Sequence, residues 1–159
     1  MSRCVLWGHA RDRARTSARG AAVVEFALIM PILLILVFGI ISYGYMLSFR
    51  QAISQAAAEG ARAAAVAQRD ADQQPDALKA INEALESYGV SCAGTSLTRN
   101  GAAAGSCSVS IGACEGDAAH QCVTARLSYD YDGNPLLPAP GMGLVLPDNL
   151  TYTAVARVS

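Results

Sequence analysis

The feature that most constrains this chain is an uncharged run of 24 residues, from Phe26 to Phe49. A helix needs about 20 mostly apolar residues to cross the hydrocarbon core of a bilayer, so this run is long enough to span a membrane with some tilt. Pro31 lies within it, and spanning helices tolerate proline where neighbouring groups satisfy the freed carbonyl. We therefore predict a transmembrane helix over residues 21–47, with Tyr43 and Tyr45 in an interfacial aromatic belt.

Charge is distributed unevenly on the two sides of this run. Five arginines and one acid precede Gly20, a balance of +4, whereas seven basic and eleven acidic residues follow Phe49, a balance of −4. A basic flank stays on the cytoplasmic side. We expect residues 1–20 to form a basic cytoplasmic leader without regular structure, and the C-terminal part to lie outside. The leader is short and has no aromatic residue beyond Trp7, so nucleic acid is not expected as a partner.

Cysteine usage fits that orientation. One cysteine, Cys4, lies in the leader, and four lie beyond the apolar run: Cys92, Cys107, Cys114 and Cys122. An even number outside the membrane indicates two disulfides in an oxidising compartment. Four cysteines allow three connectivities; the preferred one closes a hairpin loop with Cys114–Cys122 and leaves Cys92 for Cys107. The gaps between these cysteines do not match the close ligand pairs of zinc sites, so no metal is expected.

Helical character continues past the apolar run. Residues 48–70 are rich in alanine and have high helix propensity, so we expect one continuous helix from about residue 22 to 69, with residues 48–70 as an extension outside the membrane. Ala52, Ala56, Gly60 and Ala64 are spaced by four and form one stripe of small residues. Such stripes let helix backbones approach closely, although an alanine-rich segment also produces them by chance.

Residues 71–159 are predicted to form an α+β head. Pro75 suits the first position of a second helix, and Gly89 suits its C-terminal cap. Beyond it, residues 106–114, 121–132 and 150–159 alternate apolar and polar side chains, as strands do, with residues 115–120 as a loop. The fold class is therefore α+β: a long N-terminal transmembrane helix, a short helix and a small antiparallel sheet.

Glu25 directly precedes the apolar run, and three interpretations of this N-terminal region are possible. A conventional cleaved signal peptide is disfavoured because the run far exceeds the usual 7–15 residues. In a plain membrane anchor, Glu25 would be interfacial and incidental. In the third reading a peptidase cuts after Gly20, Glu25 becomes the fifth residue, and its carboxylate pairs with the new α-amino group of a neighbouring subunit. Because both charges are desolvated, such a pair would mainly fix the register between subunits.

The third reading coincides with a family resemblance. The stretch RGAAVVEF, with a glycine before the cut and glutamate at the fifth mature position, resembles a class III prepilin processing site. Together with AAAEGARAAA and the closing SYDYDGNPLLP and LTYTAVARVS, it resembles the TadE-like pseudopilins of the Flp/Tad pilus machinery. The resemblance implies that a prepilin peptidase cuts between Gly20 and Ala21 and that Glu25 is the fifth-position acid. The segment that matches the family beyond the membrane comprises Glu59, Gly60, Ala61 and Arg62.

No catalytic constellation is evident. A Ser-His-Asp arrangement needs a histidine base; His9 lies in the leader, and His120 beside Asp117 is typical of a solvated turn. Asp130 and Asp132 would share a strand face as acid/base carboxylates can, but YDYDGN is more typical of a strand that runs into a turn, with calcium binding as a remote alternative. We expect no enzyme activity and no cofactor.

These inferences combine into one hypothesis. The chain is expected to be a pilin-like single-pass protein of the cytoplasmic (inner) membrane, reaching the cell surface or pilus after processing. The expected partners are the prepilin peptidase, other pilins and pseudopilins, the pilus assembly platform and membrane lipid. The alternative is a membrane-anchored extracytoplasmic binding domain that is neither processed nor assembled.

Overall fold

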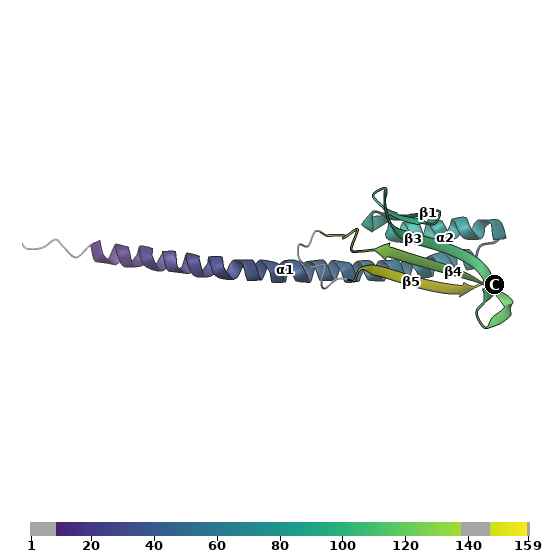
Figure 1. Ribbon diagram of the computed structural model, residues 1–159, viewed down its shortest axis with the longest axis horizontal. Helices are drawn as coiled ribbons and strands as arrows, with labels where there is room; N and C mark the ends of the chain where they lie inside the picture. Colours follow the sequence, from purple (N-terminus) through teal and green to yellow (C-terminus); the bar gives the residue numbers. More distant parts are fainter. Residues whose placement is uncertain (1–8, 138–146, 159) are drawn as a thin grey trace, which may run out of the picture. The chain divides into compact units, whose positions relative to one another are not determined.

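The computed structural model describes residues 9–137 and 147–158, with side chains from Gly20 onward. In chain order the elements are α1 (His9–Ala65), α2 (Asp70–Leu85), the 3-10 turn η1 (Glu86–Tyr88), β1 (Val90–Ala93), β2 (Ser96–Arg99), β3 (Ala102–Cys114), β4 (Asp117–Asp130) and β5 (Asn149–Arg157) (Figure 1). A long apolar helix, a shorter helix and an antiparallel sheet confirm the predicted α+β class. The chain divides into two compact units, one up to Ile41 and one from Ser42.

The limits of α1 differ from the expected ones. The helix begins at His9, so the expectation of an irregular leader is wrong for residues 9–20. Alanine and arginine dominate that stretch, and both are strong helix formers. The helix ends at Ala65 rather than near residue 69, and the amide of Ala67 then bonds the carbonyl of Ala64 at 3.3 Å in a tightened last turn.

Helix α2 also starts earlier than expected. It begins at Asp70, and Pro75 lies inside it rather than at its first position. Asp70 and Asp72 lie in the first turn, where negative charge is favoured by the helix dipole. Arg69 pairs with Asp72 at 2.7 Å across this start. The predicted glycine cap is confirmed: Gly89, at φ 65°, follows η1 and donates to the carbonyl of Glu86.

The five strands form one antiparallel sheet in the order β1-β2-β3-β4-β5. The three strand predictions in its C-terminal part are confirmed by β3, β4 and β5, which lie side by side in Figure 1. The loop expected over residues 115–120 is too long, because β4 already begins at Asp117. Strands β1 and β2 have no counterpart among the predictions.

The core of the second unit lies between the helices and one face of the sheet. Helix α1 contributes Phe49 and Ile53, both fully buried, and α2 contributes Ile81 and Leu85. Along β4, the side chains of Val123, Ala125, Leu127 and Tyr129 are all buried, whereas those at positions 124, 126 and 128 between them are half-buried or exposed. Burial of each large side chain contributes about 1.5–3 kcal/mol, so this face fixes the register of the sheet.

Candidate functional site

The predicted processing site lies on α1. Gly20, Ala21 and Glu25 are all exposed. A side chain added at Gly20 would meet nothing within 4 Å. Glu25 lies four residues after Ala21, so the two share one face of the helix, one turn apart. Glu25 has no ion-pair partner within the part of the chain that the structure describes.

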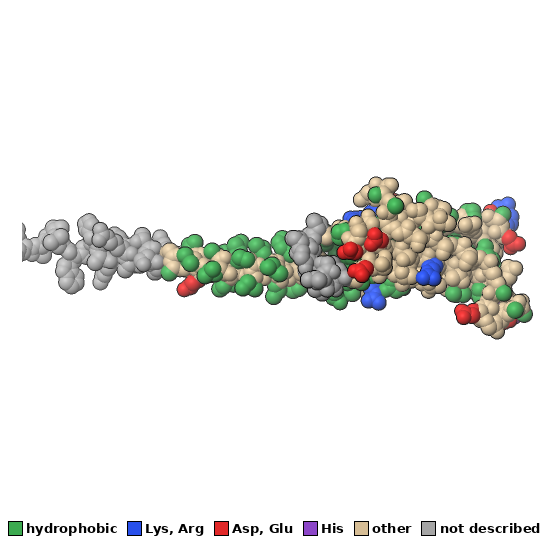
Figure 2. Space-filling view, viewed as in Figure 1, with side chains coloured by type: hydrophobic (Ala, Val, Ile, Leu, Met, Phe, Trp, Pro, Cys, Tyr) green, Lys and Arg blue, Asp and Glu red, His purple; other side chains and the backbone are tan. Residues whose placement is uncertain are grey.

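The apolar surface that follows is exposed on every side. Its large side chains include Phe26 at 59 % exposure, Ile35 at 71 % and Phe38 at 61 %. The most apolar stretch has a mean hydropathy of 2.8, and none of it is buried within the protein. Figure 2 shows hydrophobic side chains along this part of α1. The helix is thus long and apolar enough to cross a membrane, which indicates a single-pass membrane anchor.

The stripe of small residues on α1 is a packing surface inside the second unit. Ala56, Gly60 and Ala64 are buried, and Ala52 is half-buried. A Cβ atom built on Gly60 would lie 2.6 Å from Cγ1 of Ile81 and 3.3 Å from the carbonyl oxygen of Ala77. Glycine at this position therefore lets α1 and α2 approach closely, which gives Gly60 of the family-matching segment a physical role.

The other three residues of the family-matching segment differ in their exposure to solvent. Ala61 is fully buried, whereas Glu59 and Arg62 are exposed. Among the ion pairs of the described residues there is none between Glu59 and Arg62. The pair of charges thus flanks the packing face rather than stabilising it.

Aromatic side chains join the start of the second unit to its core. The ring of Phe49 lies 4.8 Å from that of Tyr129 and 5.0 Å from that of Tyr88. Tyr45 meets Tyr88 edge-on at 5.8 Å, and Ser48 shares a hydrogen bond with the hydroxyl of Tyr88 at 2.8 Å. Tyr45, predicted to lie in an interfacial belt, therefore also contacts the head.

Arg99 organises the turn after β4. Its guanidinium donates to the carbonyls of Pro135 at 2.7 Å and Leu136 at 3.2 Å. The hydroxyl of Tyr129 donates to the carbonyl of Asn134 at 2.8 Å. Burial raises the pKa of Tyr129 and of Tyr131 above the ordinary tyrosine value, with Arg99 acting in the opposite direction.

Two disulfides join the predicted cysteines in the preferred pairing. Cys92–Cys107 links β1 to β3 across a Cα separation of 6.1 Å, and Cys114–Cys122 closes the β3–β4 hairpin across 4.9 Å. Both separations lie in the usual range for disulfides. They join β1 to β3 and β3 to β4, so together they link three of the five strands covalently.

The remaining polar candidates form no compact cluster. His120 and Asp117 pair at 2.7 Å on the exposed hairpin tip, and Asp130 accepts a hydrogen bond from the amide of Gly133. Within residues 9–137 and 147–158, no three metal-ligating side chains gather into a possible metal site. The Asp130–Gly133 contact shows a carboxylate engaged by a turn, as expected of a strand that runs into one.

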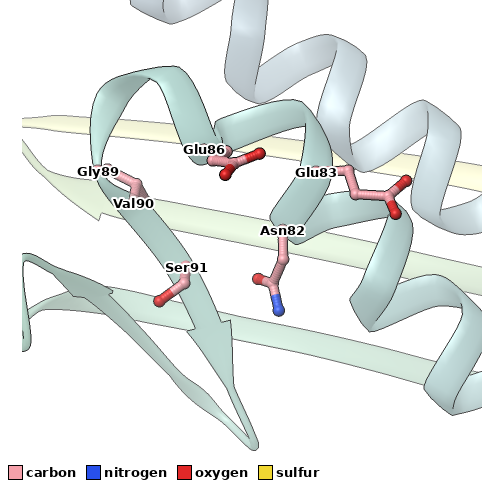
Figure 3. A pocket seen from close by; sticks show the side chains of 6 residues that line it. All are labelled: Asn82, Glu83, Glu86, Gly89, Val90 and Ser91. Atoms are coloured by element: carbon pink, nitrogen blue, oxygen red, sulfur yellow. The ribbon is translucent and has the colours of Figure 1, made fainter.

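One hollow, of about 410 Å³, lies between α2 and β1. Figure 3 shows Asn82, Glu83 and Glu86 on its helical side and Gly89, Val90 and Ser91 on the other. The Asn82 amide donates to the carbonyl of Cys92 at 3.3 Å and accepts from the amide of Cys92 at 2.6 Å. Asn82 therefore occupies the edge of β1 as a neighbouring strand would. Neither this contact nor the hollow was predicted from the sequence.

Comparison with known proteins gives a match in the N-terminal part of the chain. The family described as TadE-like protein matches residues 20–62. No curated protein and no solved structure matches the chain. The matched segment begins at Gly20 and ends at Arg62, so it contains the predicted processing site, the apolar surface and the Gly60 packing face. Over residues 20–62 the chain is therefore TadE-like, as the sequence motifs predicted.

Proposed function

We propose that this chain is a pseudopilin, or minor pilin, of Flp/Tad pilus biogenesis that is cut after Gly20 by a prepilin peptidase. The observation that supports this most strongly is the TadE-like match, which begins at Gly20 and continues along an exposed apolar helix. The leader stays in the cytoplasm and the disulfide-bonded head lies outside, as the charge balance favours. The role is structural rather than catalytic.

The geometry at Gly20 suits proteolysis. Glycine inside a helix costs roughly 0.5–1 kcal/mol relative to alanine, and Gly20 has no tertiary contact within 4 Å to offset this. Glycine at position 20 therefore lowers the free energy of the local helix opening that a peptidase needs in order to bind an extended backbone.

Cutting after Gly20 would place a new, largely protonated amine on Ala21, one helical turn from Glu25. Within one chain the carboxylate then stabilises the new helix start through the helix dipole. Between chains it pairs with the amine of a neighbour and fixes the register. Partners in this role are the prepilin peptidase, other pilins and pseudopilins, the membrane assembly platform and membrane lipid.

Intact-mass measurement of the purified mature protein tests the proposal. We expect a mature N-terminus at Ala21, and we expect Gly20→Leu to retain the leader because its side chain obstructs the peptidase. Gly44→Leu is the matched control, since a Cβ on Gly44 also meets nothing within 4 Å. A wild-type chain that keeps its first twenty residues would instead favour the membrane-anchored binding domain.

A further inference from the structure

The outer face of the sheet, opposite the helices, carries an unusual set of side chains. Cross-strand rows on this face join Ser106, Ser128 and Thr151, then Ser108, Arg126 and Thr153, then Ser110, Thr124 and Val155. All are exposed or half-buried. The face is thus a field of hydroxyl groups around Arg126, and Val155 and Arg157 are exposed on the same side of β5.

Hydroxyl side chains, rather than carboxylates, occupy the sheet positions around Arg126. The residues directly across from it, Ser108 and Thr153, and those two positions along β4, Thr124 and Ser128, all carry hydroxyls. No ion pair of Arg126 occurs among the described residues. A guanidinium surrounded by hydroxyl donors offers the charge and the hydrogen bonds that a carboxylate requires.

The opposite side of the head has the complementary charge. Helix α2 and the turn after it carry four exposed acidic residues, Asp70, Asp76, Glu83 and Glu86. Lys79 is the one exposed basic residue in the same two elements. Lys79 lies 4.0 Å from Glu83, whereas Glu86 has no ion pair within the described part of the chain. Glu83 and Glu86 both line the hollow in Figure 3, on its helical side.

We propose that these two surfaces bind each other between copies of this chain, with Arg126 of one copy pairing with Glu86 of the next. The contact is heterologous, because each copy contributes a different face, and such contacts propagate into rings or filaments. It can be repeated by copies that all keep the same direction, as copies anchored in one membrane must. The inference rests on the proposed function, for which it supplies a subunit-to-subunit surface.

Site-specific crosslinking in the native membrane tests the contact. A photo-crosslinking amino acid replaces Ser108, which lies beside Arg126, and the product is digested with trypsin after reduction. We expect the crosslink to fall within residues 80–99 of a second copy. The same group at Gln55, exposed on α1, serves as the control and should not label that peptide. Crosslinks from position 108 to a different protein, to lipid or to nothing would overturn the inference.

A charge-swap pair tests the specific ion pair. Arg126→Glu and Glu86→Arg should each lower the yield of the crosslinked dimer about tenfold, as loss of a close charge pair does. Mixing the two variants should restore it, because each then offers the face that the other lacks. Arg62→Glu, an equal change of charge on α1, is the control, and closed disulfides verify folding in every variant.

The mature N-terminus is determined in the same samples as the crosslink, so that the two proposals are tested separately. If the chain is cut at Ala21 but mixing fails to restore the crosslink, the contact is excluded and the proposed function stands. If the chain is uncut, the proposed function fails independently of the crosslink.

Discussion

At the scale of single residues, Gly60 gives the sharpest packing test. Gly60→Ala would place a Cβ 2.6 Å from Cγ1 of the fully buried Ile81. Overpacking of this kind costs about 1–3 kcal/mol, against at most about 1 kcal/mol gained in helix propensity. We expect a net loss of roughly 1 kcal/mol in the free energy of unfolding, measured by urea denaturation in detergent micelles.

Two variants control this measurement. Gly44→Ala, with nothing near the new Cβ, should leave stability unchanged or slightly raised. In a double-mutant cycle, Gly60→Ala with Ile81→Ala should cost less than the sum of the single changes, because the clash is gone. Additive losses would show that Gly60 is not required for the close approach of α2.

Glu25 is a residue whose role separates processing from assembly. Glu25→Gln keeps the size of the side chain and removes its charge. We expect the mature chain still to begin at Ala21, because the cut depends on Gly20, while piliation is lost because the neighbour's amine has no partner. Intact mass and electron microscopy of the cells measure the two effects, with Glu59→Gln as the control. Normal pili on Glu25→Gln cells would refute the register role.

The raised pKa values of Tyr129 and Tyr131 predict the alkaline limit of the head. Burial favours the neutral phenols in the folded state. Their contribution to stability is therefore complete below the unfolded pKa of about 10 and is lost as pH rises through the higher folded values. In a spectrophotometric titration of phenolate absorbance, two of the six tyrosines should ionise last, together with unfolding. Phe substitution at both positions should remove that late component.

At the scale of elements, the two disulfides should differ in their contribution. Cys92 and Cys107 are 4 % and 2 % exposed and lie 15 residues apart, whereas Cys114 and Cys122 lie 8 apart at the sheet's far end. Closing a loop of 15 residues stabilises the folded state by about 3 kcal/mol in total through the unfolded chain, and a loop of 8 residues contributes less. The double change of Cys92 and Cys107 to alanine should therefore lower the unfolding free energy more than the same change at Cys114 and Cys122. The reverse order in urea denaturation would contradict this.

The elements also show what the sequence could predict. The apolar run, the alternating strands β3 to β5 and the Gly89 cap depend on local patterns, so they were found. Strands β1 and β2 were missed, although Asn100 and Gly101, at φ 50° and 86° between β2 and β3, form an Asn-Gly pair typical of a tight hairpin turn. The alternation in β1 and β2 spans only four residues each, too few for periodicity to reveal.

At the scale of the whole molecule, some features of the candidate site follow from local sequence and others only from tertiary contacts. The roles of Gly20 and Glu25 stay predictions, and they depend only on distance along the chain from the apolar run. The contact of Gly60 with Ile81 and the hydroxyl neighbours of Arg126 on the outer sheet face could not be predicted, because both arise from segments that only the fold brings together. Sequence alone identified Gly60 as part of a stripe but not its partner.

The basic leader is predicted to set the orientation of the protein in the membrane, and the redox state of the cysteines in the head can be used to measure that orientation. Changing Arg11, Arg13 and Arg15 to Gln leaves two arginines before the apolar run, Arg3 and Arg19, against three soon after it, Arg50, Arg62 and Arg69. The balance of positive charge that sets orientation is then reversed, and a fraction of heads should stay in the cytoplasm.

In that reducing compartment the disulfides do not form. Alkylation followed by mass spectrometry should find thiols at Cys92, Cys107, Cys114 and Cys122 in the inverted fraction and none of them in the wild type. Lysine at the same three positions is the matched control, because it keeps the charge and should keep the disulfides closed. Closed disulfides in the glutamine variant would mean that the apolar helix, rather than the basic leader, determines which side of the membrane receives the head.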